Sequence, residues 1–204
     1  MMKTNFTTLD EQYKDMLQEL GNIGSGNAVS ALSQMLGDRL ELSMPQCKVV
    51  ANTNLDTLLQ DKRSLYVGVV LSIEGDLQCV IALLLNEEFA VMALERLVGE
   101  TIDSVEQLTE MQRSAICEIG NIMCNSYVTA LAGLLGMPAT VSVPSMIVDT
   151  GERILNLFVK NYLGADSELL FVKNNFYCQD QSLESHILLH PDVKTVQDIL
   201  QHLS

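Results

Sequence analysis

ELGNIGSGNAVSALSQMLG, residues 19–37, recurs further along the chain as EIGNIMCNSYVTALAGLLG, residues 118–136. The two stretches share Glu, Gly, Asn and Ile at the start, Val, Ala and Leu in the middle, and Leu-Gly at the end. Pro45 and Pro144 keep the same offset. A long-period internal repeat determines the architecture of a chain. The sequence therefore predicts two copies of one module that meet near residues 99–104.

Each copy is predicted to contain a long helix, a strand interrupted by proline, a short helix, two antiparallel strands and a closing helix. In the first copy these elements are expected at residues 10–37, 40–50, 54–60, 64–85 and 86–99. In the second copy they are expected at residues 105–136, 139–146, 152–163, 168–190 and 192–203. Segment 152–163 alone fits a helix or a strand, and its place in the repeat favours the helix. Thr8 or Asp10 is expected to cap the first helix.

The predicted fold class is α/β. It consists of two pseudo-symmetric repeats, each a long helix plus antiparallel strands and shorter helices, with the sheet packed against the helices. Residues 1–204 are expected to form a single domain, with the repeats at about 8–99 and 105–203. We expect a monomer, because the two halves can pair with each other.

The glycines of GNIGSG suggest a nucleotide-binding loop as an alternative to a helix. Their intervals differ from those of the dinucleotide motif, and a polar segment precedes them where that motif has a strand. The second copy also replaces Gly24 and Gly26 by Met123 and Asn125. What recurs is Glu-x-x-Asn, which favours the helix.

Small residues form a stripe along the first long helix, and bulkier residues occupy the corresponding face of the second. The small residues include Gly21, Gly24, Ala28 and Ala31, and the bulkier ones are Ile116, Met123, Tyr127 and Leu134. An interior glycine costs a helix ~1 kcal/mol relative to alanine. Close approach of another helix would offset this cost. We therefore expect the two long helices to pack on each other, with large residues opposite small ones.

The composition narrows the possible partners. The net charge is −14, which disfavours contact with nucleic acid or anionic membranes. The longest apolar runs are too short to cross a bilayer, and the N-terminal residues do not resemble a secretory signal. The 5 cysteines include no Cys-x-x-Cys pair, which favours a reduced, cytoplasmic protein. The 3 histidines lack metal-ligand spacing, so we expect surface histidines and no metal site.

One polar face recurs on both long helices. At 100° per residue, its members in each copy lie within about 60° of one another. They are Asp15, Glu19 and Asn22 in the first copy and Ser114, Glu118 and Asn121 in the second. A solvated helix face would also be polar, but asparagine is a mediocre helix former and the face avoids lysine and arginine.

An amide and a carboxylate side by side suit a limited range of chemistry. A carboxamide cannot act as a base at neutral pH, but it can hold a water molecule in a fixed direction. A carboxylate one turn away can pair with a cation on a partner. The pair suits phosphoryl transfer in which the substrate supplies the electrophile and the metal.

Asp/Ser-x-x-x-Glu-x-x-Asn, followed by a distant proline, resembles the signature of the CheC/CheX/FliY phosphatases of bacterial chemotaxis. The signature occurs twice, and the resemblance covers nearly the whole chain. Two sites with little additional sequence most resemble the CheC branch, because CheX has one site and FliY carries a further domain.

The resemblance implies that the substrate is phosphorylated CheY, a response regulator with an aspartyl phosphate. It implies no cofactor in this chain, since the receiver carries its own Mg²⁺. The asparagines would orient the attacking water, and the glutamates would pair with the receiver's lysine. The implied catalytic residues are Glu19, Asn22, Glu118 and Asn121. Asp15 and Ser114 would assist docking, and Pro45 and Pro144 would shape a strand edge.

The same resemblance implies CheD as a second partner. Segment 152–163 is a candidate contact for CheD, and a core-packed helix is the alternative. Two other interpretations of the chain remain open. One is a non-catalytic adaptor that binds phosphorylated CheY, CheD or both, and the other is an unrelated structural α/β protein. Because the first long helix is richer in glycine, Asn121 is expected to contribute more activity than Asn22.

Overall fold

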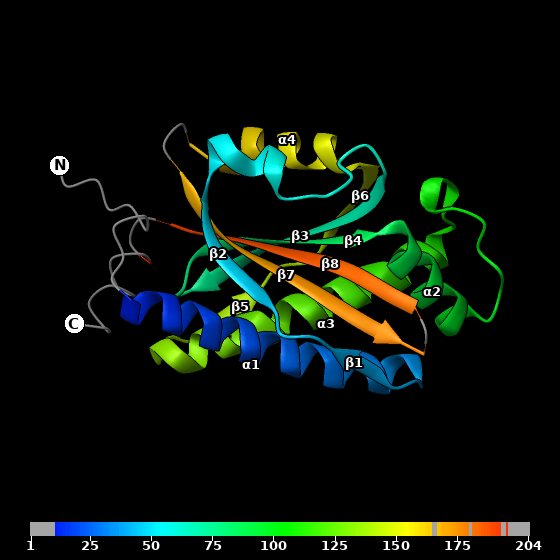
Figure 1. Ribbon diagram of the computed structural model, residues 1–204, viewed down its shortest axis with the longest axis horizontal. Helices are drawn as coiled ribbons and strands as arrows, with labels where there is room; N and C mark the ends of the chain where they lie inside the picture. The colour runs from blue at the N-terminus through cyan, green and yellow to red at the C-terminus, as the bar shows by residue number, and fades with distance from the viewer. Residues whose placement is uncertain (1–10, 165–166, 180, 193–194, 196–204) are drawn as a thin grey trace.

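The computed structural model describes residues 11–164, 167–179, 181–192 and 195 (Figure 1). The helices are α1 (Glu11–Leu36), α2 (Glu87–Val98), α3 (Glu110–Leu135) and α4 (Gly151–Tyr162), with 3-10 turns η2 (Asn52–Thr57) and η3 (Val105–Gln107). The strands are β1 (Leu40–Leu42), β2 (Gln46–Ala51), β3 (Leu65–Gly75), β4 (Cys79–Asn86), β5 (Ala139–Val141), β6 (Ser145–Thr150), β7 (Glu168–Cys178) and β8 (Gln181–Pro191).

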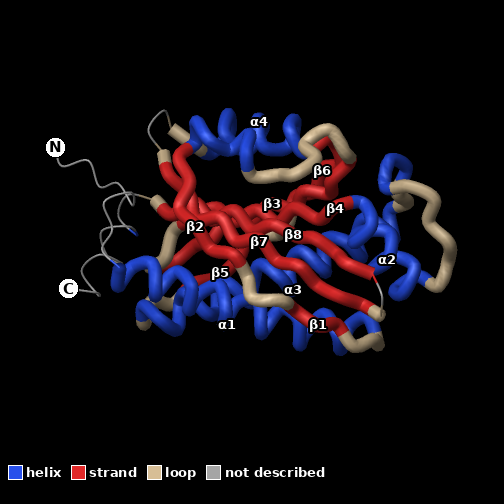
Figure 2. Tube along the Cα trace, in the orientation of Figure 1, coloured by secondary structure: helices blue, strands red, loops and turns tan. Residues whose placement is uncertain are grey.

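The strands form one antiparallel sheet between two layers of helix (Figure 2). The strand order is β1-β7-β8-β4-β3-β5, with β2 also paired to β7 and β6 also paired to β3. One buried cluster joins the sheet to α1, α2 and α3, and a second joins its other face to α4 and η2. This arrangement confirms the predicted α/β class with a sheet packed against helices.

Both halves of the chain present their elements in the same order, from a long helix through a broken edge strand to a pair of long strands. That the halves are two copies of one module stays a prediction, as do its boundaries. Apart from Asp192 and Thr195, the predicted helix at 192–203 lies outside the described residues, as does the predicted cap at Thr8 or Asp10.

Proline breaks each edge strand into two pieces. The strand predicted at 40–50 is β1 and β2, and Pro45 lies between them. Pro144 separates β5 from β6 in the same way. Both pairs of pieces lie outermost in the sheet, as expected for strands that contain a residue without a backbone N–H.

Two predicted helices differ from the observed elements, one in its starting residue and the other in its helix type. The helix predicted at 105–136 begins only at Glu110, because Thr109 and Gln112 form a capping box there. The helix predicted at 54–60 is the 3-10 turn η2. The helical interpretation of 152–163 is confirmed by α4, whose first turn is capped by Thr150.

The two long helices pack on each other and run in opposite directions (Figure 1). A Cβ atom on Gly24 would lie 2.5 Å from Tyr127 Cδ1, so only glycine admits the tyrosine ring at this separation. The expectation of large residues opposite small ones is therefore confirmed at this pair. It is wrong for Leu134, which is 40% exposed, whereas the adjacent Leu135 is buried.

A buried polar network reinforces this contact. Tyr127 Oη lies 2.6 Å from Ser25 Oγ, and Asn174 of β7 donates to Tyr127 Oη at 2.9 Å. Ser25 Oγ also donates to Asn174 Oδ1 at 2.7 Å. Buried polar groups need such partners, so the network ties the two helices and the sheet into one arrangement.

His186 contradicts the expectation that the histidines lie on the surface. It is fully buried on β8, with its ring stacked on Phe171 at a centroid distance of 5.3 Å. Its Nε2 lies 3.1 Å from Glu184 Oε1, and Glu184 also pairs with Lys173. Burial lowers the pKa of His186, and this effect outweighs the opposite effect of Glu184.

We expect the stability to fall as the pH drops below about 6.5, the ordinary histidine pKa. Since the pKa of His186 is lower in the folded state, the unfolded chain takes up a proton that the folded chain does not. The free energy of unfolding can fall by about 1.4 kcal/mol for each pH unit below about 6.5. Urea unfolding of the wild type and of His186→Phe between pH 7.5 and 5.5 checks this. The wild type should lose more, and parallel curves would contradict the assignment.

Candidate active site

The predicted site residues lie on the outer surfaces of α1 and α3. Asp15, Glu19, Ser114 and Glu118 are exposed, and Asn22 and Asn121 are half-buried. In each helix the acids lie on the exposed side, and the amide lies at the edge of the buried side. The structure thus brings each acid and amide of a pair together on one ridge, with the two ridges on neighbouring helices of the same layer (Figure 1).

The glycines beside the first pair have packing roles. Gly21 faces Cys47 of β2, and Gly24 faces Tyr127. Gly120, which precedes Asn121, lies against the sheet, where an added Cβ would be 2.5 Å from Val69 Cγ1. The helices therefore lie close to the sheet and to each other directly beneath the amides. Because α1 and α3 pack closely here, the backbone that carries each acid–amide pair is part of a rigid element.

The Asn22 amide is held by Gln18, a residue that the sequence analysis missed. Gln18 Nε2 donates to Asn22 Oδ1 at 3.1 Å and to the carbonyl oxygen of Pro45 at 3.0 Å. Pro45 is buried in the connection between β1 and β2. Besides interrupting the edge strand, it thus supplies an anchor for the residue that contacts the amide.

The Asn121 amide is held from the other side, by Asn125, which the sequence analysis also missed as a site residue. Asn125 Nδ2 donates to Asn121 Oδ1 at 2.8 Å and to the carbonyl oxygen of Asn121 at 2.9 Å. The sequence did contain a signal for both partners, because Gln18 and Asn125 are polar side chains one helical turn away from the amides. Pro144 is half-buried between β5 and β6.

The second ridge also carries a thiol, since Cys117 precedes Glu118. Burial raises the pKa of Cys117, and this effect outweighs the nearby charge of Arg113, which lowers it. The thiol is therefore protonated at neutral pH and unsuited to nucleophilic attack. All 5 cysteines are free thiols. In the described part of the chain, no group of three or more His, Cys, Asp or Glu residues could hold a metal ion.

Sequence comparison places this site in a known context. The CheC-like family matches residues 14–48, and the family of the chemotaxis phosphatase CheX matches residues 67–162. The chain is 27% identical over 198 residues to the CheY-P phosphatase CheC of Bacillus subtilis, and the match covers 95% of each chain. Along nearly its whole length, this chain is similar to proteins of the CheC/CheX/FliY family.

The fold of this CheC-like chain is shared with solved structures. The crystal structure of Thermotoga maritima FliY matches with a TM-score of 0.76 and 21% identity, covering 96% of this chain and 98% of that one. The structure of a CheX–CheY–BeF3–Mg²⁺ complex from Borrelia burgdorferi matches with a TM-score of 0.53 and 21% identity, covering 85% and 99%. At this level of identity the two likenesses concern the fold alone.

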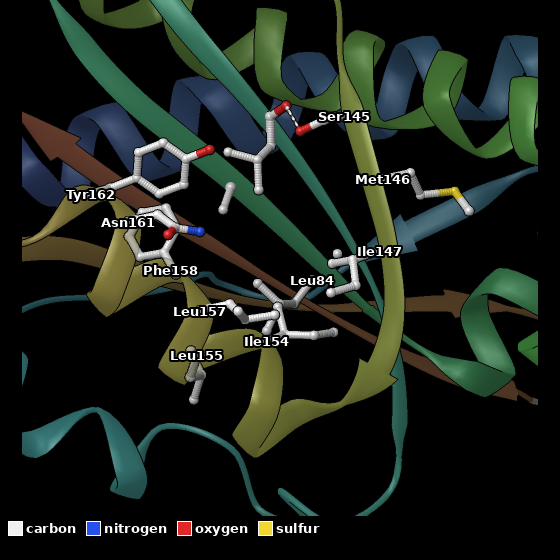
Figure 3. Close-up of a pocket in the computed structure, with 13 residues that line it drawn as sticks. Leu84, Ser145, Met146, Ile147, Ile154, Leu155, Leu157, Phe158, Asn161 and Tyr162 are labelled. Carbon is white, nitrogen blue, oxygen red and sulfur yellow. Dashed lines mark hydrogen bonds between the residues drawn. The ribbon is translucent and has the colours of Figure 1, made fainter.

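A separate pocket of this CheC-like chain lies on the other face of the sheet, under α4 (Figure 3). Its volume is about 160 Å³, and its lining is mostly apolar, with Ile147, Ile154 and Phe158 among its residues. The sheet separates this pocket from the two amides, so it takes no part in the candidate site. None of the described helices is both long and apolar enough to span a membrane.

Proposed function

We propose that this chain is a phosphatase that hydrolyses the aspartyl phosphate of CheY. The observation that carries the proposal is the pair of exposed ridges, each with an acid and an amide one turn apart on a long helix. Similarity to the CheC-like and CheX families supports it, as does the name of the Bacillus subtilis relative. The Borrelia burgdorferi complex supports CheY as the partner.

In the proposed reaction, Asn22 or Asn121 holds a water molecule in line with the phosphorus. A bond forms between the water oxygen and phosphorus, and the bond from phosphorus to the aspartyl oxygen breaks. Inorganic phosphate and a free aspartate carboxylate result. Glu19 and Glu118 pair with the lysine of the receiver, and the receiver's Mg²⁺ neutralises charge on the phosphoryl group. Positioning and charge neutralisation are the main sources of catalysis in this reaction class.

Asp15 and Ser114 precede the glutamates by one helical turn and are both exposed. They are suited to contact with a docked receiver at the rim of each site. Pro45 and Pro144 act on strand geometry in this proposal and do not contact phosphate.

Phosphate release from phosphorylated CheY tests the proposal directly. We expect catalytic amounts of this chain to accelerate release over many turnovers. The alternative function, an adaptor that holds phosphorylated CheY or CheD, predicts stoichiometric binding with no acceleration. That result would reject the enzyme.

CheD stays a predicted second partner, and α4 is the candidate contact. Ile154 and Phe158 are buried against the sheet, whereas Leu157 and Tyr162 are 37% and 39% exposed. The outer side of α4 therefore offers apolar surface that its packing does not use. We expect Leu157→Glu to weaken CheD binding at least tenfold in calorimetry, because a charge would be buried at the contact. Thr129→Glu, at an exposed position of α3, serves as the control, and equal affinities would remove α4 from the proposal.

A further inference from the structure

We propose that Gln18 and Asn125 are positioning residues, which set the direction in which the amides of Asn22 and Asn121 face the substrate. This inference rests on the proposed phosphatase function. An asparagine amide presents an oxygen acceptor on one side and N–H donors on the other. Rotation by 180° exchanges them, so a water molecule is held correctly only if one orientation is fixed.

In the first site a backbone carbonyl determines the orientation. The carbonyl oxygen of Pro45 can only accept, so the Gln18 atom 3.0 Å away must be the amide nitrogen. The same nitrogen lies 3.1 Å from the Asn22 amide, and its second N–H needs an acceptor. The Asn22 atom on that side is therefore Oδ1, and the Asn22 NH₂ group points the other way.

In the second site another carbonyl has the same effect. The backbone carbonyl of Asn121 can only accept, so the Asn125 atom 2.9 Å away must be the amide nitrogen. That nitrogen also lies 2.8 Å from the Asn121 side chain, which therefore presents Oδ1 to it. Both sites thus have a carbonyl, a donating amide and the oxygen of the proposed catalytic asparagine in one chain of hydrogen bonds.

The donor of one site has no counterpart in the other site. The repeat pairs Gln18 with Cys117, whose thiol cannot donate two such bonds, and pairs Asn125 with Gly26, which has no side chain. One partner lies a turn before the amide and the other a turn after it. The oxygen therefore faces the preceding turn in the first site and the following turn in the second, but in both sites it is engaged and the NH₂ group is left for the substrate. Two unrelated side chains fix the amide in this way, which is expected if a fixed amide is required.

The double variant Gln18→Met/Asn125→Ala tests the inference. Methionine keeps the length of the side chain but donates no hydrogen bond, and alanine is a better helix former than asparagine. We expect kcat for phosphorylated CheY to fall about tenfold, as loss of a positioning hydrogen bond implies. KM should stay within twofold, because Glu19 and Glu118 remain. Thermal unfolding should be unchanged.

Gly26 offers a rescue that a merely structural role would not permit. A Cβ at Gly26 would meet no atom within 4 Å, and this position corresponds to Asn125 in the other site. Adding Gly26→Asn to the double variant gives Asn22 a donor of the second-site type. We expect it to restore a measurable part of the lost kcat but less than half, because it repairs only the first site and Asn121 is expected to contribute more activity than Asn22. Gly26→Ala is the matched control, since it adds a side chain without an amide, and it should restore nothing.

Four outcomes would overturn the inference: an unchanged kcat in the double variant, a rise in KM alone, no rescue by Gly26→Asn, or equal rescue by Gly26→Ala. Failure of the proposed function is distinct from all of them. It would appear as full phosphate release by a chain that lacks both Asn22 and Asn121, or as no release by the wild type.

Discussion

Replacing Asn22 and Asn121 together by alanine is expected to reduce the kcat for phosphate release from phosphorylated CheY by about 100-fold or more. The estimate follows from the proposed mechanism, since loss of a group that holds the nucleophile in line removes most of the benefit of positioning. Binding of phosphorylated CheY should persist, because the glutamates and the exposed rims of both ridges are untouched. Phosphate release and receiver binding should therefore separate in this variant.

Asn27→Ala is the matched control for this experiment. Asn27 is an exposed asparagine on the same helix, displaced around it from the ridge. The substitution has the same effect on helix propensity but should leave kcat unchanged. Equal losses in the control and in a site variant would show that the helix and not the amide matters. Of the single variants, Asn121→Ala should lose more activity than Asn22→Ala, and the reverse order would refute the ranking.

Gly24→Leu is expected to lower the free energy of unfolding by about 3 kcal/mol, the upper range for overpacking of a close-packed interior. The first added carbon would already lie 2.5 Å from Tyr127 Cδ1. The ring cannot move freely, because its hydroxyl is bonded to Ser25 and Asn174. Either α1 separates from α3 or the buried network breaks, and both are unfavourable.

Gly26→Ala provides the opposite result in the same helix. Gly26 has open space around its Cα, so the methyl group adds helix propensity without a clash. We expect the variant to gain about 1 kcal/mol. Thermal unfolding followed by circular dichroism compares the two, with a decrease of roughly 6–12 °C for Gly24→Leu in a chain of this size. Similar melting temperatures would show that the Gly24–Tyr127 contact does not constrain the helices.

Local patterns in the sequence were sufficient for most of the elements and for the two ridges, whereas α4 was predicted only from its place in the repeat. Helical periodicity placed Glu19 and Asn22 on one exposed face, and the turn signal at Gly75 separated β3 from β4. Gln18 and Asn125 lie only one helical turn from the amides that they contact. The long-range contacts were harder to predict, because their partners are distant in the sequence. Gln18 reaches a carbonyl 27 residues away, and Ser25 pairs with a tyrosine 102 residues away.

The buried His186 shows a different limit. The segment SHILLH contains the short apolar run of a buried strand, but such a run does not reveal what covers each face of a sheet. His186 is covered because Phe171 of the adjacent strand β7 and Tyr66 of β3, two strands away, approach its ring. Only the strand order, which depends on the whole chain, brings these aromatic residues together.

The antiparallel packing of α1 and α3 limits how many receivers can be engaged at once. With Gly24 against Tyr127 and a rise of 1.5 Å per residue, the two amides are on the order of 10 Å apart along the helix axes. A globular domain of 100 residues has a radius of gyration of about 13 Å. Under the proposed function, we expect two such domains to crowd each other when docked this close along the helices. The second amide would then offer an alternative landing position for one receiver more than a place for a second receiver.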